Sequence, residues 1–309
     1  MTLVQLEYII ALDNYRHFAV AAEKCFVTQP TLSMQIQKLE DTLDVKIFDR
    51  SKHPIEPTKM GVKILEQARI VIAESKKVQE LIDQEKNEIK GDVRIAIIPT
   101  LAPYLVPLFV SPLTSKYEEV SLQITESLTD SILDQIKKDQ VDIGILVTPI
   151  DDADIREIPI LYEEFFVYAS HQHPLFQSKK IETENINTSG LWLLNEGHCF
   201  RNQTLNICGK ASNHEKRFTY ESGSLEALKR LVDKNGGYTL LPELYAMELE
   251  RNDQSKLRHF LDPVPTREVS LVVKKSFAKH QLVEAIRSVI LENLPPLMKS
   301  RKNSNVVKF

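Results

Sequence analysis

Apolar residues recur at helical spacing near the start of the chain and predict short, packed helices over residues 3–58. Residues 18–22 begin a second, alanine-rich helix, and a third is predicted over residues 31–43. Thr28 is a candidate N-cap for this third helix, and Pro30 fits its first turn. The apolar positions are Leu3, Leu6, Ile9, Ile10 and Leu12 in the first helix and Leu32, Ile36, Leu39 and Leu43 in the third. Two helices joined by a tight turn, the second polar on its outer face, favour a helix-turn-helix, although periodicity alone fits a generic three-helix unit equally well.

Residues 45–57 are basic and rich in proline, and we interpret them as a wing or hairpin beside these helices. Lys46, Arg50, Lys52 and His53 precede Pro54 and Pro57. Residues 1–60 contain seven Lys and Arg against eight Asp and Glu, so only a local arrangement of charge can attract phosphate.

A long helix is predicted from Thr58 to about Ile89, because apolar residues recur along it at intervals of three, four or seven. They are Ile64, Ala68, Val71, Val78, Ile82 and Ile89, and Ser75 and Glu85 interrupt the series. A helix of this length exceeds what a small neighbouring domain can cover, so the stripe predicts a partial coiled contact between two chains.

From Gly91 the periodicity changes to that of strands alternating with helices, which predicts a parallel α/β sheet. The alternation breaks near residues 162–164 and then restarts, so the chain leaves one α/β unit, builds a second and returns to the first. This course predicts two lobes joined by crossing strands, with ligands at the carboxyl ends of strands. Strands are expected at 93–98, 120–124, 141–147, 165–169, 191–194 and 268–273, and helices at 131–138 and 278–291.

Composition describes an ordinary globular protein of several domains: 309 residues, 42% hydrophobic and 27% charged. We expect no secretory signal, and no membrane span, because the most apolar stretch, 104–110, is short and contains Pro107. Three cysteines are too few for a secreted disulfide framework, which favours a reducing compartment, the cytoplasm. A net charge of −4 argues against bulk binding of nucleic acid but not against one localised DNA-reading element.

Two cysteines carry the most distinctive chemistry of the chain. Cys199 lies between His198 and Arg201, and Cys208 follows nine residues later. Nearby positive charge favours the thiolate, and a second thiol within reach is typical of a peroxide-reactive sensor. Spacing alone favours two unrelated buried cysteines.

The motifs together resemble the signature of the LysR-type transcriptional regulators, in residues 18–23, 28–33, 35–36, 39–40, 48–50, 58 and 61. The resemblance implies a winged helix-turn-helix at 1–58, a dimerisation helix at 59–90 and a two-lobed regulatory domain, similar to periplasmic solute-binding proteins, at 91–297. Lobe I is expected at about 91–162 and 267–297, lobe II at about 163–266, and a flexible tail at 298–309. It further implies double-stranded DNA and RNA polymerase as partners and a homodimer or homotetramer. The residues expected at DNA are Thr28, Gln29, Pro30, Thr31, Ser33, Gln35 and Lys38, with Arg50 on phosphate.

Within this family, residues 98–100, 197–203 and Cys208 resemble the members that sense hydrogen peroxide, whereas residues 237–242 match a pattern shared by many members. The resemblance makes Cys199 the peroxidatic and Cys208 the resolving thiol, with His198 and Arg201 stabilising the thiolate and Thr100 and Thr129 orienting peroxide. Phe200, Asn202 and the pair Thr219-Tyr220 depart from that pattern. If the segment between the cysteines is helical, they lie about 13.5 Å apart along its axis, and bonding requires it to unravel.

We expect no cofactor and no metal, a cellular dithiol as reductant, and no enzymatic role. His171 and His173 were considered as a metal pair, but His173 starts an ordinary loop ending of this family. Two alternatives remain open: a LysR-type regulator that responds to a small organic metabolite between the lobes, and a thiol peroxidase.

Overall fold

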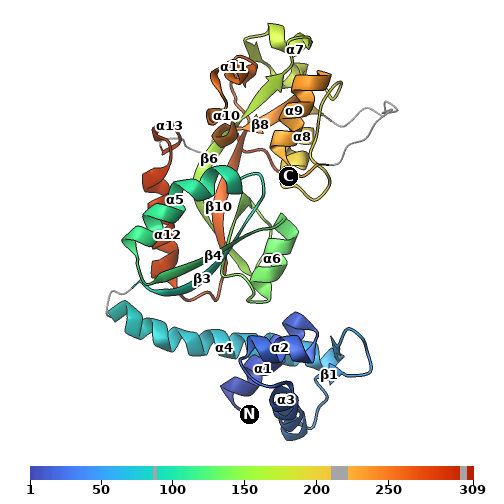
Figure 1. Cartoon of the computed structure of the whole chain (residues 1–309), viewed down its shortest axis with the longest axis vertical. Helices are drawn as coiled ribbons and strands as arrows, with labels where there is room; N and C mark the ends of the chain where they lie inside the picture. The colour runs from blue at the N-terminus through green and yellow to red at the C-terminus, as the bar shows by residue number, and fades with distance from the viewer. Residues whose placement is uncertain (86–88, 210–221, 300–304) are drawn as a thin grey trace. The chain divides into compact units, whose positions relative to one another are not determined.

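The computed structural model describes residues 1–309 except 86–88, 210–221 and 300–304, and the side chains of 79–81 and 83–85 are also left out. The chain forms two compact units, one built mainly from residues 1–85 and the other mainly from residues 89–309 (Figure 1). Each is described by itself. Within the described residues, no helix is both long and apolar enough to cross a membrane.

The N-terminal unit is a winged helix-turn-helix, as its periodicity predicts. Its elements are α1 Leu3–Tyr15, α2 Phe18–Lys24, α3 Gln29–Leu43, β1 Phe48–Asp49, β2 Glu56–Pro57 and α4 Lys59–Glu85. The Thr2 hydroxyl accepts the Gln5 N–H while the Gln5 side chain accepts the Thr2 N–H, which caps α1 at its start. Thr28 caps α3 by accepting the Thr31 N–H. The predicted apolar stripes of α1 and α3 meet in one core that includes Ile9 and Leu32, both 0% exposed.

Glu40 fastens the wing to α3. Its buried carboxylate accepts the N–H groups of Ile47 (2.8 Å) and Phe48 (3.2 Å) at the start of β1. The Arg50 guanidinium donates to the same carboxylate at 3.2 Å and lies over the Phe18 ring. Arg50 therefore has a structural ion pair, in addition to whatever contact it makes with phosphate.

The apolar stripe of α4 divides into two parts. Ala68 is buried in the core of its own unit, and Ile64 and Val71 pack against that core. Further along, Val78 and Ile82 are 62% and 45% exposed. The expectation that one continuous stripe faces a second chain is wrong for its first half, because α1 covers this part of α4.

The C-terminal unit contains a mixed sheet with the strand order β4-β3-β5-β10-β6-β9-β7, and β8 also pairs with β6. The strands are β3 Gly91–Ile97, β4 Val120–Glu126, β5 Ile143–Thr148, β6 Ile155–Ala169, β7 Lys180–Ile181, β8 Tyr238–Pro242, β9 Leu257–Phe260 and β10 Thr266–Lys274. The strands β4, β3 and β5 are parallel, whereas β10 runs antiparallel to both β5 and β6.

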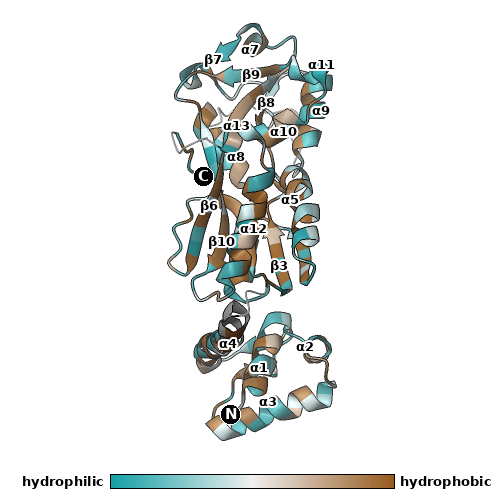
Figure 2. Cartoon of the chain, turned by 90° about the vertical axis from the view of Figure 1, so that its left-hand side faces the viewer, coloured by the Kyte–Doolittle hydropathy of each residue, from teal (hydrophilic) through white to brown (hydrophobic). Residues whose placement is uncertain are grey.

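The long strand β6 joins the two lobes. Its first part pairs with β10, and residues 165–169 pair with β8 (Figure 2). The expected break at residues 162–164 is therefore the passage of one continuous strand between lobes. The expected strand at 191–194 is replaced by an isolated bridge from Leu191 to Tyr238.

Helices complete both lobes. They are α5 Ala102–Lys116, α6 Thr129–Lys137, α7 Pro174–Gln177, α8 Cys199–Cys208, α9 Leu225–Asn235, α10 Glu243–Met247, α11 Arg251–Gln254, α12 His280–Asn293 and α13 Pro296–Lys299, with a 3-10 turn at Thr183–Asn185. The expected flexible tail differs in part, because residues 305–309 are hydrogen bonded to the sheet and to α8.

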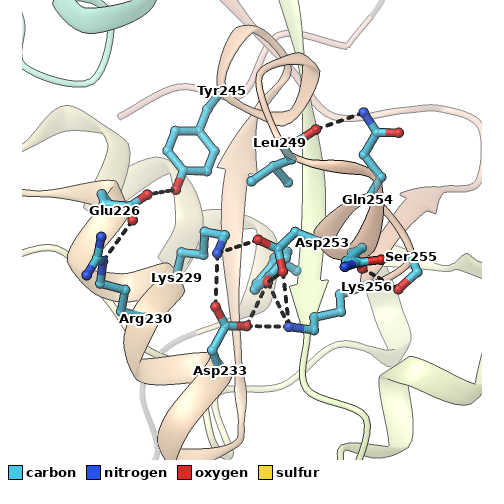
Figure 3. Close-up of polar contacts among 12 residues, drawn as sticks. Glu226, Lys229, Arg230, Asp233, Tyr245, Leu249, Asp253, Gln254, Ser255 and Lys256 are labelled. Carbon is cyan, nitrogen blue, oxygen red and sulfur yellow. Dashed lines mark hydrogen bonds and ion pairs between the residues drawn. The ribbon is translucent and has the colours of Figure 1, made fainter.

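A cluster of opposite charges braces lobe II (Figure 3). Lys256 pairs with Asp233 (2.6 Å) and Asp253 (3.2 Å), and Lys229 pairs with the same two carboxylates at 2.9 and 2.6 Å. The Tyr168 hydroxyl donates to Asp233 at 2.7 Å. Two ammonium groups match two carboxylates, so the cluster fastens α9 and α11 to β6 and offers no uncompensated charge to a ligand.

Candidate redox site and nucleic-acid surface

The helix α8 begins at Cys199 and ends at Cys208, so the two thiols occupy its opposite ends. Gly197 has φ +90°, a left-handed conformation that glycine adopts readily, and it turns the chain into the helix. Cys199 is 6% and Cys208 4% exposed, and all three cysteines of the chain are free thiols. Because Cys199 occupies the first position of α8, unpaired backbone N–H groups of the helix start lie next to its sulfur.

Burial raises the pKa of Cys199 above its ordinary value, and three kinds of group work against this effect. The positive charge of Arg267 lowers the pKa, as do hydrogen bonds from the Thr129 hydroxyl and the Phe200 N–H. The site therefore stores a mostly protonated thiol surrounded by groups that stabilise its thiolate.

Arg267 is the cation at this thiol, and the sequence analysis missed it. It is the second residue of β10, is 0% exposed, and its guanidinium lies over the Phe200 ring. It is held by Glu163 Oε2, 2.8 Å from Nε and 2.7 Å from Nη2, and donates from Nη1 to Thr100 Oγ1 at 3.0 Å. The available signal was an arginine at the start of a strand that is otherwise largely apolar.

The four predicted peroxide-site residues have different surroundings. Thr100 orients Arg267, and Thr129, the first residue of α6, turns its buried hydroxyl to Cys199, with no further partner among the described residues. Burial lowers the pKa of His198, which keeps it neutral at neutral pH and unable to stabilise a thiolate by charge. Arg201 donates from Nη1 to the Leu194 carbonyl at 2.8 Å. The expectation that Arg201 and His198 supply the positive charge is corrected in favour of Arg267.

Cys208 is a poor nucleophile in this conformation. Burial raises its pKa to about 12, although a hydrogen bond with the Tyr238 hydroxyl acts in the lowering direction. The Tyr238 hydroxyl also donates to the Asn187 carbonyl. Cys208 belongs to the apolar core of lobe II together with Ile207.

The departures from the family pattern also have defined surroundings. Phe200 is buried and stacks on Phe165 with ring centroids 5.3 Å apart, whereas Asn202 is exposed. Thr219 and Tyr220 lie outside the described residues. The considered metal pair is occupied otherwise, because His171 packs on Phe176 and His173 Nδ1 accepts the Leu175 N–H. Across the described residues, no group of three or more His, Cys, Asp or Glu could hold a metal ion.

The predicted DNA-facing residues lie on and around α3. Thr28, Gln29, Pro30 and Lys38 are exposed, whereas Thr31, Ser33 and Gln35 are half-buried. Gln35 accepts a hydrogen bond from Gln5 of α1 at 3.1 Å, which fixes its side-chain amide.

Two further exposed side chains in this region were not predicted. Met34 is 60% exposed on α3, and Phe26 is 96% exposed in the turn before α3. An apolar side chain beside a reading helix suits the thymine methyl group.

Two family models match the chain and together cover most of it. Residues 3–62 match the bacterial regulatory helix-turn-helix protein, lysR family, and residues 86–295 match the LysR substrate binding domain. The chain belongs to the LysR family of transcriptional regulators.

LysR-family relatives align over nearly the whole chain. The hydrogen peroxide-inducible genes activator of Haemophilus influenzae is 32% identical over 98% of this chain and 100% of that protein. The DNA-binding transcriptional dual regulator OxyR of Escherichia coli is 32% identical over 93% of this chain and 95% of that protein. Among solved structures, full-length OxyR from Pseudomonas aeruginosa with a cysteine-to-aspartate substitution has a TM-score of 0.79 and 34% identity, covering 94% and 97% of the two chains.

Proposed function

We propose that this chain is a DNA-binding transcriptional regulator that senses hydrogen peroxide by reversible formation of a Cys199–Cys208 disulfide and controls oxidative-stress genes. The observation that carries the proposal is Cys199 at the start of α8, buried beside Arg267 and a Thr129 hydroxyl with no other described partner. The names of the H. influenzae and E. coli relatives support the same signal.

In the first step the Cys199 thiolate attacks one oxygen of peroxide. An S–O bond forms and the O–O bond breaks, so sulfur is oxidised to a sulfenic acid while the departing hydroxide takes a proton and becomes water. Arg267 stabilises the thiolate, and the hydroxyls of Thr129 and Thr100 are suited to orient the peroxide. Peroxide is the oxidant, so no cofactor is required.

In the second step the Cys208 sulfur displaces the hydroxyl of the sulfenic acid. An S–S bond forms, the S–O bond breaks, and water leaves with the proton of Cys208. Nine residues of helix span about 13.5 Å, whereas the Cα atoms of a disulfide lie about 4.4–6.8 Å apart. The second step therefore requires α8 to unfold, and that refolding is the conformational signal.

The N-terminal unit supplies the output. Residues of α3 and the preceding turn contact the major groove, and Val78 and Ile82 form part of the surface by which two chains associate as a homodimer, and further as a homotetramer. RNA polymerase receives the signal, a cellular dithiol reverses it, and the protein acts in the cytoplasm without catalytic turnover. The observation against a thiol peroxidase is the DNA-reading unit, which such an enzyme would not use.

Mass spectrometry of peptides after a brief peroxide pulse tests the proposal. We expect a Cys199–Cys208 linkage that a dithiol reverses, its loss in Cys199→Ser, and a sulfenic acid that persists in Cys208→Ser. Cys25→Ser is the control, because Cys25 packs against the core of the N-terminal unit. Free thiols at both positions together with an intact transcriptional response would assign the function to a metabolite-binding regulator.

A further inference from the structure

The end of the chain returns to the redox site. Val306 forms a parallel bridge with Thr266, the first residue of β10, and two backbone hydrogen bonds flank it. The Thr266 N–H donates to the Asn305 carbonyl at 2.9 Å, and the Val307 N–H donates to the Thr266 carbonyl at 2.8 Å. The Asn305 side chain adds a bond from Nδ2 to the Pro263 carbonyl at 2.9 Å. Residues 305–309 are therefore anchored next to Arg267, the cation of the peroxidatic thiol.

The same segment holds α8 through two side-chain amides. Gln203 Nε2 donates to the Val307 carbonyl at 2.8 Å, and Asn206 Nδ2 donates to the Lys308 carbonyl at 2.9 Å. Gln203 and Asn206 are three residues apart, so they project from one face of the helix between the two cysteines. Val307 also packs against the apolar cluster that includes Cys208. Figures 1 and 2 both place the C terminus beside α8.

We propose that residues 305–309 act as a clamp that keeps α8 helical and thereby sets the equilibrium between the Cys199–Cys208 dithiol and its disulfide. The inference rests on the proposed peroxide-sensing function and adds the element that opposes disulfide formation. Gln203 and Asn206 are positioning residues in this scheme, because they act on the cysteines through the helix.

The clamp follows from what disulfide formation does to these bonds. Unfolding α8 moves Gln203 and Asn206 away from carbonyls that are fixed to β10. Gln203 is 0% exposed, so its amide loses a buried partner, which is more unfavourable than losing a bond in water. The dithiol state keeps all of these contacts, and the disulfide state must break at least the two bonds to the clamp.

The first test compares the full chain with a variant that ends before Asn305, each equilibrated in dithiothreitol redox buffers, with thiols counted after alkylation. We expect the equilibrium of the truncated chain to move about tenfold toward the disulfide, the contribution of two neutral hydrogen bonds, which equals about 30 mV for this two-electron couple. An equal equilibrium in both chains overturns the clamp.

A matched pair of substitutions keeps the test decisive if the truncated chain is poorly folded. Asn206→Ala and Asn202→Ala gain the same helix propensity on exposed positions of α8, and only Asn206 donates to the clamp. We expect Asn206→Ala to lie about fivefold further toward the disulfide than Asn202→Ala. Identical values for the two variants refute the clamp.

Hydrogen exchange separates failure of the clamp from failure of the proposed function. In the dithiol state, the α8 amides of Asn206→Ala should exchange about fivefold faster than those of Asn202→Ala. If the full chain forms no Cys199–Cys208 disulfide in any buffer, the peroxide proposal fails while this difference still supports a clamp on α8. Equal exchange in the two variants overturns the clamp even when the disulfide forms.

Discussion

Replacing Arg267 by Met tests which cation stabilises the Cys199 thiolate. Arg267 is fully buried and paired with Glu163, so the single substitution leaves a buried carboxylate without its partner. Breaking a buried ion pair in this way costs about 3–5 kcal/mol. A second change, Glu163→Gln, removes the orphaned charge and keeps an oxygen that can accept the Leu244 N–H now held by Glu163 at 2.7 Å. We expect the double variant to recover most of the lost stability.

The chemical deficit should remain in the double variant. Removing the positive charge raises the pKa of Cys199 further, because Arg267 is the charge that opposes the effect of burial. A close opposite charge changes the thiolate population at neutral pH by about tenfold or more, so peroxide should oxidise Cys199 slower by a similar factor. Raising the pH should restore part of the rate, since more thiolate then forms.

The assay is the rate of sulfenic acid formation, followed from pH 6 to 9 in a Cys208→Ser background that isolates the first step. Arg201→Met is the matched control, because the Arg201 guanidinium donates to the Leu194 carbonyl. We expect its pH profile to stay close to that of the parent chain. A strong shift for Arg201→Met, with none for the Arg267→Met and Glu163→Gln double variant, would refute the geometric argument and restore the interpretation from sequence.

Two further predictions concern the N-terminal unit. Val71→Asp puts a charge against the core of its own unit and should lower its unfolding free energy by about 2 kcal/mol or more, whereas Val78→Asp, at a position 62% exposed, should leave stability unchanged and weaken self-association in sedimentation; equal effects on self-association would contradict the division of α4. Phe26 has φ +55° and is 96% exposed, so Phe26→Asn should relieve left-handed strain and raise stability by about 0.5–1 kcal/mol in urea unfolding. A loss of stability would show that the Phe26 ring packs on the protein.

Local chemistry made the N-terminal unit predictable. The cap at Thr28 and the stripe through Leu32, Ile36 and Leu39 depend on residues within a few positions of one another, and α3 forms as expected. For α4 the spacing was right and the partner was wrong. Periodicity identifies an apolar face, but it does not distinguish a neighbouring helix of the same chain from a second chain.

The redox site was predictable only for residues near Cys199 in sequence or on recognisable motifs. Arg267 reaches the thiol from β10, and its burial depends on the pairing with Glu163 of β6, which no local pattern contains. Arg201 was favoured because it adjoins the cysteine, but the turn of α8 directs its side chain to the Leu194 carbonyl. The clamp was missed for a related reason, since its contacts with α8 use backbone carbonyls of residues 307 and 308, and composition carries no information about them.

The two thiols are protected in different ways, and the difference fixes the order in which they react. Burial raises the pKa of both, but Cys199 has Arg267, Thr129 and the start of α8 beside it, whereas Cys208 has only the Tyr238 hydroxyl acting in the same direction and a pKa of about 12. At neutral pH Cys208 is therefore a neutral thiol held in an apolar core, at the far end of a helix from its partner. It becomes a competent nucleophile only after α8 opens and exposes it to water. The barrier to the second step thus lies in the helix and its clamp, and the barrier to the first lies in the electrostatics around Cys199.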